Sequence, residues 1–135
     1  GYPGRMAIVY AETIPTKSVG RVRFSFAADG TLEEIKLGAD SRSGGRGKAS
    51  ASVPSRAKLE RWLTAYLAGR DLPFPGKWEI PGKTDFARSV YAAVAALKVG
   101  ETLSYGEVAE RAGSAKACRA VGTAMGHNPI PLLVP

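Results

Sequence analysis

The sequence has very little of what disulfide bridges and metal sites require. Its 135 residues contain one cysteine and one histidine. A single cysteine forms no disulfide framework, so we expect a reducing, cytoplasmic setting. Structural zinc sites bind the metal through four ligands, mainly Cys and His, and we therefore expect no metal site.

Long apolar runs are missing as well. No stretch approaches the roughly 18 consecutive apolar residues of a membrane-spanning helix, so no such helix is expected. The first ten residues, GYPGRMAIVY, lack the apolar region and cleavage site of a secretory signal peptide. The hydrophobic content of 44% is sufficient for a packed globular core.

Basic side chains outnumber acidic ones. Nineteen Lys and Arg against 12 Asp and Glu give a formal net charge of +7, which favours a polyanionic partner such as nucleic acid or a membrane surface. The excess is spread along the chain, with 13 basic and 8 acidic side chains in residues 1–80 and 6 and 4 in residues 81–135. On charge alone, a role in solubility explains the excess equally well.

The first part of the chain predicts a small antiparallel sheet. Residues 6–14 and 19–27 are rich in Val, Ile, Phe and Tyr, which is typical of strands. Asp29 and Gly30 predict a hairpin turn that leads into a third strand at residues 31–37.

A Gly/Ser-rich basic segment follows at residues 38–53, GADSRSGGRGKASASV. It has almost nothing to bury and predicts a flexible surface loop. A nucleic-acid-binding arm is the alternative.

Ser55 is the predicted N-cap of a helix that ends near Gly69. The Pro- and Gly-rich residues 72–82 form a connector with a short strand at residues 78–80, and a boundary between two lobes is expected there. The aromatic pair of this helix, Trp62 and Tyr66, is expected in the core against the sheet. The apolar stripe of this helix is Leu59, Trp62, Leu63, Tyr66 and Leu67.

Three helices are predicted after the boundary. The first begins at Thr84 or Asp85 and ends at Gly100. The second begins with a capping box, in which Ser104 and Glu107 satisfy each other's backbone amides, and it ends at Gly113. The third is capped by Ser114 and ends at Gly126, and an Asn-Pro turn then leads to a strand-like apolar run, IPLLVP. Ala117, Ala120, Val121, Ala124 and Met125 give the third helix a face of mostly small residues.

Two short helices joined by a Gly-containing turn are typical of a helix-turn-helix. In the last helix, Lys116 and Arg119 lie among Ala117, Ala120 and Gly122. Small residues would let the backbone approach a nucleic-acid groove. A small-residue face packed on another helix explains the pattern equally well.

Residues 84–135 resemble the C-terminal domain of the O6-alkylguanine-DNA alkyltransferases, also called methylated-DNA–protein-cysteine methyltransferases. The resemblance is carried by a Phe-containing first helix, by GETLSYGE, by KACRAVGTA and by NPIP before an apolar run. It implies an α+β fold with a ribonuclease-H-like lobe at residues 1–80 and a winged-helix or helix-turn-helix lobe at residues 81–135. The first lobe fits by architecture alone.

The family's activity implies specific DNA contacts. Arg119 would fill the gap left by a flipped guanine, and Tyr105 would help rotate the nucleotide by crowding its phosphate. Lys116 would contact a phosphate, while Ala117 and Gly122 would belong to the helix that enters the minor groove. The implied partner is double-stranded DNA containing O6-alkylguanine, bound by a monomer with no membrane association.

The resemblance also implies a reaction centre. Asn128 would hold the active-site turn, and Tyr105 would lie near the target base. Met125 and Pro131 would form part of the alkyl pocket. No cofactor is needed, because the alkylated base is itself the donor.

The family's nucleophile is the cysteine of a Pro-Cys-His-Arg motif, whose proline matches Pro135. We therefore expect the 135 residues to be the part of a repair enzyme that precedes the nucleophile. Cys118 is expected to be an inert apolar filler, and His127 a surface residue. Two other functions stay open: a lesion-binding protein that does not transfer the alkyl group, and a winged-helix transcription regulator.

Overall fold

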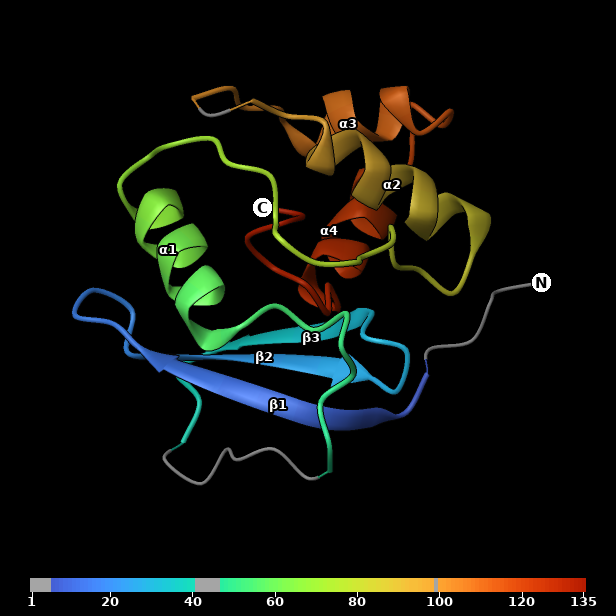
Figure 1. Cartoon of the computed structure of the whole chain (residues 1–135). Helices are drawn as coiled ribbons and strands as arrows, with labels where there is room; N and C mark the ends of the chain where they lie inside the picture. The colour runs from blue at the N-terminus through green and yellow to red at the C-terminus, as the bar shows by residue number, and fades with distance from the viewer. Residues whose placement is uncertain (1–5, 41–46, 99) are drawn as a thin grey trace. The chain divides into compact units, whose positions relative to one another are not determined.

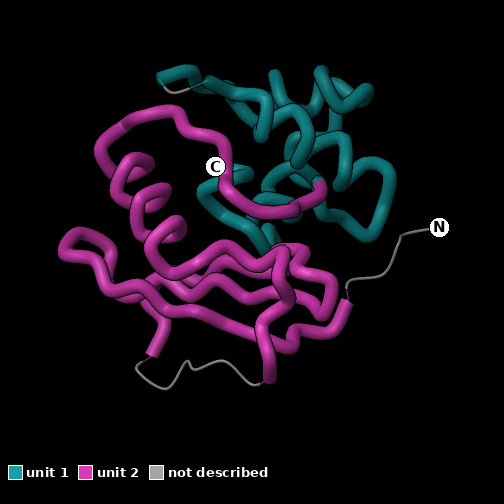
Figure 2. Tube along the Cα trace, in the orientation of Figure 1, with its two compact units in different colours: residues 1–4, 80–135 teal, residues 5–79 magenta. Residues whose placement is uncertain are grey.

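The structure is a computed structural model that describes residues 6–40, 47–98 and 100–135 (Figure 1). The chain forms two compact units, one of Arg5–Glu79 and one that contains Ile80–Pro135 (Figure 2). The described residues form one antiparallel sheet and four helices, which confirms the predicted α+β class. None of the helices they form has the length and hydropathy needed to cross a membrane.

The first unit is built on a three-stranded meander. Strands β1 (Ile8–Pro15), β2 (Arg21–Ala27) and β3 (Leu32–Leu37) pair antiparallel in the order β1-β2-β3. These strands lie within a residue or two of the predicted ranges. The predicted short strand at residues 78–80 is absent, and that segment has no regular structure.

The hairpin between β2 and β3 depends on the Asp-Gly pair. The Asp29 carboxylate accepts a hydrogen bond from the backbone N–H of Thr31 at 2.9 Å, and this bond lowers the pKa of Asp29. Gly30 has a φ of 90°, a left-handed conformation that favours glycine. A Cβ at Gly30 would also lie 2.5 Å from the Cβ of Ser52, so the site has no room for a side chain.

Aromatic rings fill the core of this unit. Phe24 of β2 is completely buried and packs edge-on against Trp62, with ring centroids 6.1 Å apart. Phe74 packs against both rings, at 5.1 Å from Trp62 and 6.1 Å from Phe24. The Trp62 indole N–H donates to the carbonyl of Leu72 at 3.0 Å. Trp62 is therefore a core residue, as predicted.

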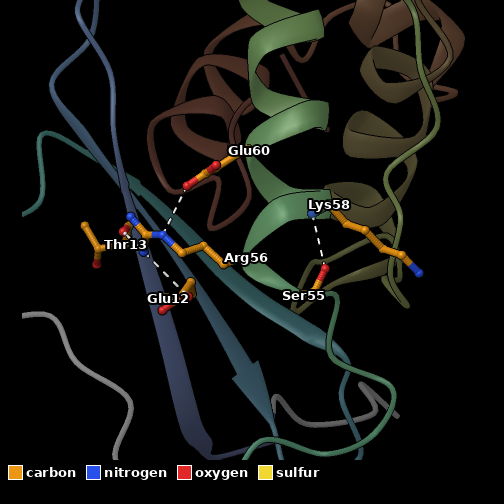
Figure 3. A network of polar contacts seen from close by, with 6 residues as sticks. All are labelled: Glu12, Thr13, Ser55, Arg56, Lys58 and Glu60. Carbon is orange, nitrogen blue, oxygen red and sulfur yellow. Dashed lines mark hydrogen bonds and ion pairs between the residues drawn. The ribbon is translucent and has the colours of Figure 1, made fainter.

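Helix α1 (Arg56–Leu67) is attached to the edge of the sheet at its N-terminal end (Figure 3). The Ser55 hydroxyl accepts the amide of Lys58 at 3.3 Å, which confirms Ser55 as the N-cap. The Arg56 guanidinium donates to the Thr13 carbonyl of β1 at 2.9 Å and lies 3.6 Å from the Glu12 carboxylate and 3.1 Å from that of Glu60. The helix ends before Gly69, whose φ is 77°, as predicted.

Helix α2 (Asp85–Ala95) opens the second unit. Its N-cap is Thr84, whose hydroxyl accepts the amide of Ala87 at 3.0 Å. The predicted end at Gly100 is wrong, because the helix stops at Ala95. The Glu101 carboxylate accepts the amide of Lys98 at 2.6 Å, and this local turn competes with continuation of the helix.

Helix α3 (Tyr105–Arg111) begins with the predicted capping box. Ser104 accepts the Glu107 amide at 3.1 Å, and the Glu107 carboxylate accepts the Ser104 amide at 3.0 Å. The hydrogen bond from the Ser104 amide lowers the pKa of Glu107. The helix is followed by Gly113, whose φ is 91°, so its predicted end is also confirmed.

Helix α4 (Cys118–Gly126) begins later than predicted. Ser114 is not its N-cap, because the chain first makes a turn in which the Ala117 amide bonds to the Ser114 carbonyl at 3.0 Å. The amide of Ser114 in turn bonds to the carbonyl of Ala109 at 2.9 Å, so this residue completes the end of α3. Ala117 takes the N-cap position and offers no side-chain bond.

The core and the surface network of the first unit should contribute very differently to stability. We expect Phe24→Ala to lower the free energy of unfolding by about 3–5 kcal/mol, because it leaves a cavity between β2 and α1. Arg56→Met should cost at most about 1 kcal/mol, since the side chain is 47% exposed and its ion pairs are screened by water. Urea denaturation measures both, and equal losses would contradict this assignment of the core.

Candidate nucleic-acid interface

Helices α3 and α4, with the turn between them, form the predicted pair of short helices. Within α4, Val121 is fully buried, whereas Arg119 and Ala120 are exposed. The predicted small-residue face therefore contains both the buried Val121 and the exposed Ala120. The small-residue side of α4 is open at this position and leaves the backbone accessible beside Arg119.

Tyr105 lies where the two helices meet. It is the first residue of α3, and it is 53% exposed. A Cβ placed on Gly122 of α4 would lie 3.3 Å from Cε2 of the Tyr105 ring and 3.6 Å from its Cδ2. The ring thus rests on helix backbone that has no side chain. Because Arg119 precedes Gly122 by three residues, it lies on the same side of α4.

Two basic side chains accompany this contact. Lys116 lies in the turn before α4, Arg119 lies in the first turn of α4, and both are exposed. Across the described residues, neither of these two side chains takes part in an ion pair. Both positive charges are therefore available to an external anion.

Asn128 closes the segment that follows α4. Its side-chain N–H donates to the carbonyl of Val134 at 2.5 Å, and its side-chain oxygen accepts the amide of Ile130 at 3.0 Å. The predicted strand at residues 130–135 is wrong, because the segment is a turn in which Leu132 has a φ of 81°. Backbone groups that would pair with a neighbouring strand bond within the turn, since the Val134 amide reaches the Ile130 carbonyl at 3.1 Å.

Buried side chains anchor this turn at both ends. Ile130 is 2% exposed and Val134 is completely buried. Met125 and Pro131 are half-buried. Their placement in an alkyl pocket stays a prediction.

The lone cysteine and the lone histidine both lie at ends of α4. Cys118 is exposed, so its interpretation as a buried filler is wrong. A Cβ added at Gly106 would lie 3.7 Å from the Cys118 sulfur, which places the thiol beside the start of α3. His127 is exposed, as predicted, and its Nδ1 lies 2.9 Å from the carbonyl of Thr123.

Known proteins share both the sequence and the fold of this chain. The model of the 6-O-methylguanine DNA methyltransferase DNA-binding domain matches residues 85–135. The methylated-DNA–protein-cysteine methyltransferase of Mycobacterium bovis is 47% identical over 73 residues, which are 54% of this chain and 44% of that protein. The corresponding protein of Methanosarcina acetivorans is 39% identical over 98 residues, covering 67% of this chain and 62% of that protein.

Solved structures extend the likeness to nearly the whole chain. The crystal structure of the Mycobacterium tuberculosis protein OGT in complex with DNA is 31% identical, with a TM-score of 0.72 over 94% of this chain and 76% of that one. The M. tuberculosis O6-methylguanine methyltransferase gives 30% identity and a TM-score of 0.71 over 93% and 74%. The chain belongs to the O6-alkylguanine-DNA alkyltransferase family.

The sequence alignments do not cover the full length of these relatives. The aligned segment covers less than half the length of the mycobacterial proteins that it matches. The family-model match contains α2, α3, α4 and the Asn128 turn, so it includes every residue assigned here to the interface.

One residue that supports helix α4 from below the surface was missed from the sequence. Tyr91 of α2 is only 3% exposed, and its hydroxyl donates to the carbonyl of Ala124 in α4 at 2.6 Å. The sequence signal that could have indicated a buried Tyr91 was its position directly after Val90 in an amphipathic helix. A buried phenol usually finds a hydrogen-bond acceptor, although the sequence does not say which one.

The two bonds of Asn128 should be separable by substitution. Asn128→Ala removes both bonds and should lower the free energy of unfolding by about 1–3 kcal/mol, because the amide of Ile130 loses its partner. Asn128→Asp keeps the acceptor for that amide and loses the donor to Val134, so it should fall between the wild type and Asn128→Ala. Urea denaturation with amide exchange at Ile130 measures the effect. Unchanged protection of that amide in Asn128→Ala would contradict the role of the side chain.

Proposed function

We propose that the complete protein is a DNA repair enzyme, a methylated-DNA–protein-cysteine S-methyltransferase. It transfers an alkyl group, typically methyl, from O6 of guanine in double-stranded DNA to one of its own cysteines. The observation that carries the proposal is that the exposed Tyr105 ring rests on Gly122 of α4, with the exposed Arg119 three residues earlier in the same helix. An exposed aromatic ring, an unpaired guanidinium and bare helix backbone are suited to holding a duplex with one base displaced.

The proposed reaction is a single displacement. A cysteine thiolate attacks the alkyl carbon, a sulfur–carbon bond forms, and the bond from that carbon to O6 breaks. The electron pair stays on the guanine, which is restored and takes up a proton. A thioether is not hydrolysed back, so each protein molecule acts once. The alkylated base supplies the group, and no cofactor is required.

The nucleophile is proposed at the position directly after Pro135, where the family has Cys followed by His. A thiolate forms near neutral pH only with a neighbouring base or positive charge, and that histidine would provide the base. Cys118 does not take this role in the proposal, since it lies at the start of α4, away from the turn that Asn128 closes. The turn supports the assignment, because Asn128 holds the carbonyl of Val134, the residue before Pro135.

The DNA would be engaged from the minor groove by α4. In the proposal, Arg119 enters the duplex in place of the flipped guanine, and Tyr105 crowds the phosphate of that nucleotide. Gly122 and Ala117 let the helix backbone approach, and Lys116 binds a phosphate. The exposure of Arg119 and Lys116 and the absence of ion pairs on them in the described chain support these roles.

The remaining site assignments concern the target base. Asn128 would position the backbone that leads to the nucleophile, and Tyr105 would lie near the base. Met125 and Pro131 would form part of the apolar wall for the alkyl group, which suits their half-buried positions. The protein would act as a cytoplasmic monomer on duplex DNA that contains O6-alkylguanine.

The proposal also assigns a lobe to each of the two parts of the chain. Residues 81–135 would form the DNA-binding alkyltransferase lobe, and residues 1–80 a ribonuclease-H-like lobe. The basic loop at residues 38–53 would be a solvated connection. Its residues 41–46 lie outside the described part of the chain.

The activity is tested with the complete protein. It is incubated with a duplex containing a single O6-methylguanine, and intact and peptide mass spectrometry follow the cysteines. We expect one added methyl group on the cysteine after Pro135. A lesion-bound protein with no methylated cysteine would reject the transferase and identify a lesion-binding protein. Equal affinity for lesion and plain duplexes would reject both.

Arg119 is the most specific residue for this function. We expect Arg119→Ala to slow methyl transfer by about 10- to 100-fold, since one stacking contact to a base contributes roughly 1–3 kcal/mol. Its melting temperature should stay close to that of the wild type, because exposed side chains contribute little to stability. Arg111→Ala is the matched control, as it removes an exposed arginine from the last turn of α3. Equal transfer rates in the two variants would exclude the intercalating role.

A further inference from the structure

Helix α4 has few local signals that hold it in place. It has nine residues, an N-cap without a side-chain bond, no acidic residue in its first turn and no basic residue in its last turn. Short helices of this kind are marginal in isolation and depend on tertiary packing. The orientation of α4 must therefore come from the helices around it.

Two of the packing contacts of α4 act by shape. Val121 is completely buried, and the Tyr105 ring lies over Gly122. Apolar contacts of this kind attract without a preferred direction. They keep α4 against its neighbours but constrain its rotation about its own axis only weakly.

The Tyr91 hydroxyl adds a directional contact. It donates from α2 to the carbonyl of Ala124 at 2.6 Å, and the same carbonyl accepts the amide of His127 at 3.1 Å. The bond thus joins α2 to the last turn of α4. Hydrogen bonds weaken steeply when they are bent, so a rotation of α4 would break this bond before it disturbed the apolar packing.

We propose that Tyr91 is a positioning residue that fixes the rotation of α4 and thereby the direction of Arg119. The inference rests on the proposed function, in which Arg119 enters the duplex. Tyr91 touches neither DNA nor the reacting atoms, because its side chain is buried and its hydroxyl is bonded to backbone. A displacement of about 1 Å at a reacting group is enough to cost a large factor in rate.

The test uses the complete protein and the variant Tyr91→Phe, which keeps the ring and removes the hydroxyl. We expect the single-turnover rate of methyl transfer at saturating O6-methylguanine duplex to fall about tenfold. The rate is taken per folded molecule, well below the melting temperature, so a loss of stability alone would not change it. Tyr66→Phe is the control, since it removes a half-buried hydroxyl from α1 in the other unit. A Tyr91→Phe rate within twofold of the control would overturn the proposal.

A measurement without DNA tests the contact independently of activity. In Tyr91→Phe, the carbonyl carbon shift of Ala124 and the amide shifts of residues 118–127 should change, while those of α3 away from Tyr105 stay constant. If the wild-type protein transferred no methyl group, the proposed function would fail, and these shifts would still decide whether Tyr91 orients α4. Unchanged shifts along α4 would overturn the positioning role.

The proposal can also be tested if the Tyr91→Phe variant does not fold. In the wild-type protein, the hydroxyl proton of Tyr91 should exchange slowly with water and be visible by NMR, because it is buried and bonded to the Ala124 carbonyl. A rapidly exchanging hydroxyl proton would overturn the proposal on the wild-type protein alone.

Discussion

The absence of a side chain at Gly122 is the constraint on which the candidate interface depends. Any other residue would place a Cβ 3.3 Å from the ring of Tyr105, so the ring would have to shift by a few tenths of an ångström. With glycine, the ring lies against the backbone of α4 and stays exposed. A single bare backbone position thus lets an aromatic ring from one helix lie against the next helix, in which Arg119 is exposed.

A second constraint acts after α4, where the side chain of one asparagine makes hydrogen bonds that a strand would make with a neighbouring strand. Asn128 uses its amide group as donor and acceptor at once, toward Val134 and Ile130. The backbone is thereby fixed immediately before Pro135, the residue after which the nucleophile is proposed. A side chain that bonds main-chain groups two and six residues further along the chain orders a turn without help from a sheet, and buried Ile130 and Val134 hold that turn in place.

The first unit shows how far local signals reach. Three features could be predicted from the sequence: the hairpin at Asp29 and Gly30, the cap at Ser55 and the glycine after α1. Each depends on hydrogen bonds or backbone angles within a few residues. The capping box of α3 could be predicted from the sequence for the same reason. Predictions failed where two local options competed, as at Ser114, whose amide completes α3 and whose side chain was expected to start α4.

The sequence by itself determined the fold class, the capped helix starts and the family, because these depend on local chemistry and on contiguous motifs. It also pointed to Arg119, Tyr105 and Asn128 as site residues. Only the tertiary structure decided that Tyr105 rests on Gly122, that residues 130–135 form a turn and that Tyr91 bonds α4. The physical reason is separation along the chain, since Tyr91 and Ala124 are 33 residues apart and no local pattern encodes which carbonyl a buried hydroxyl will meet.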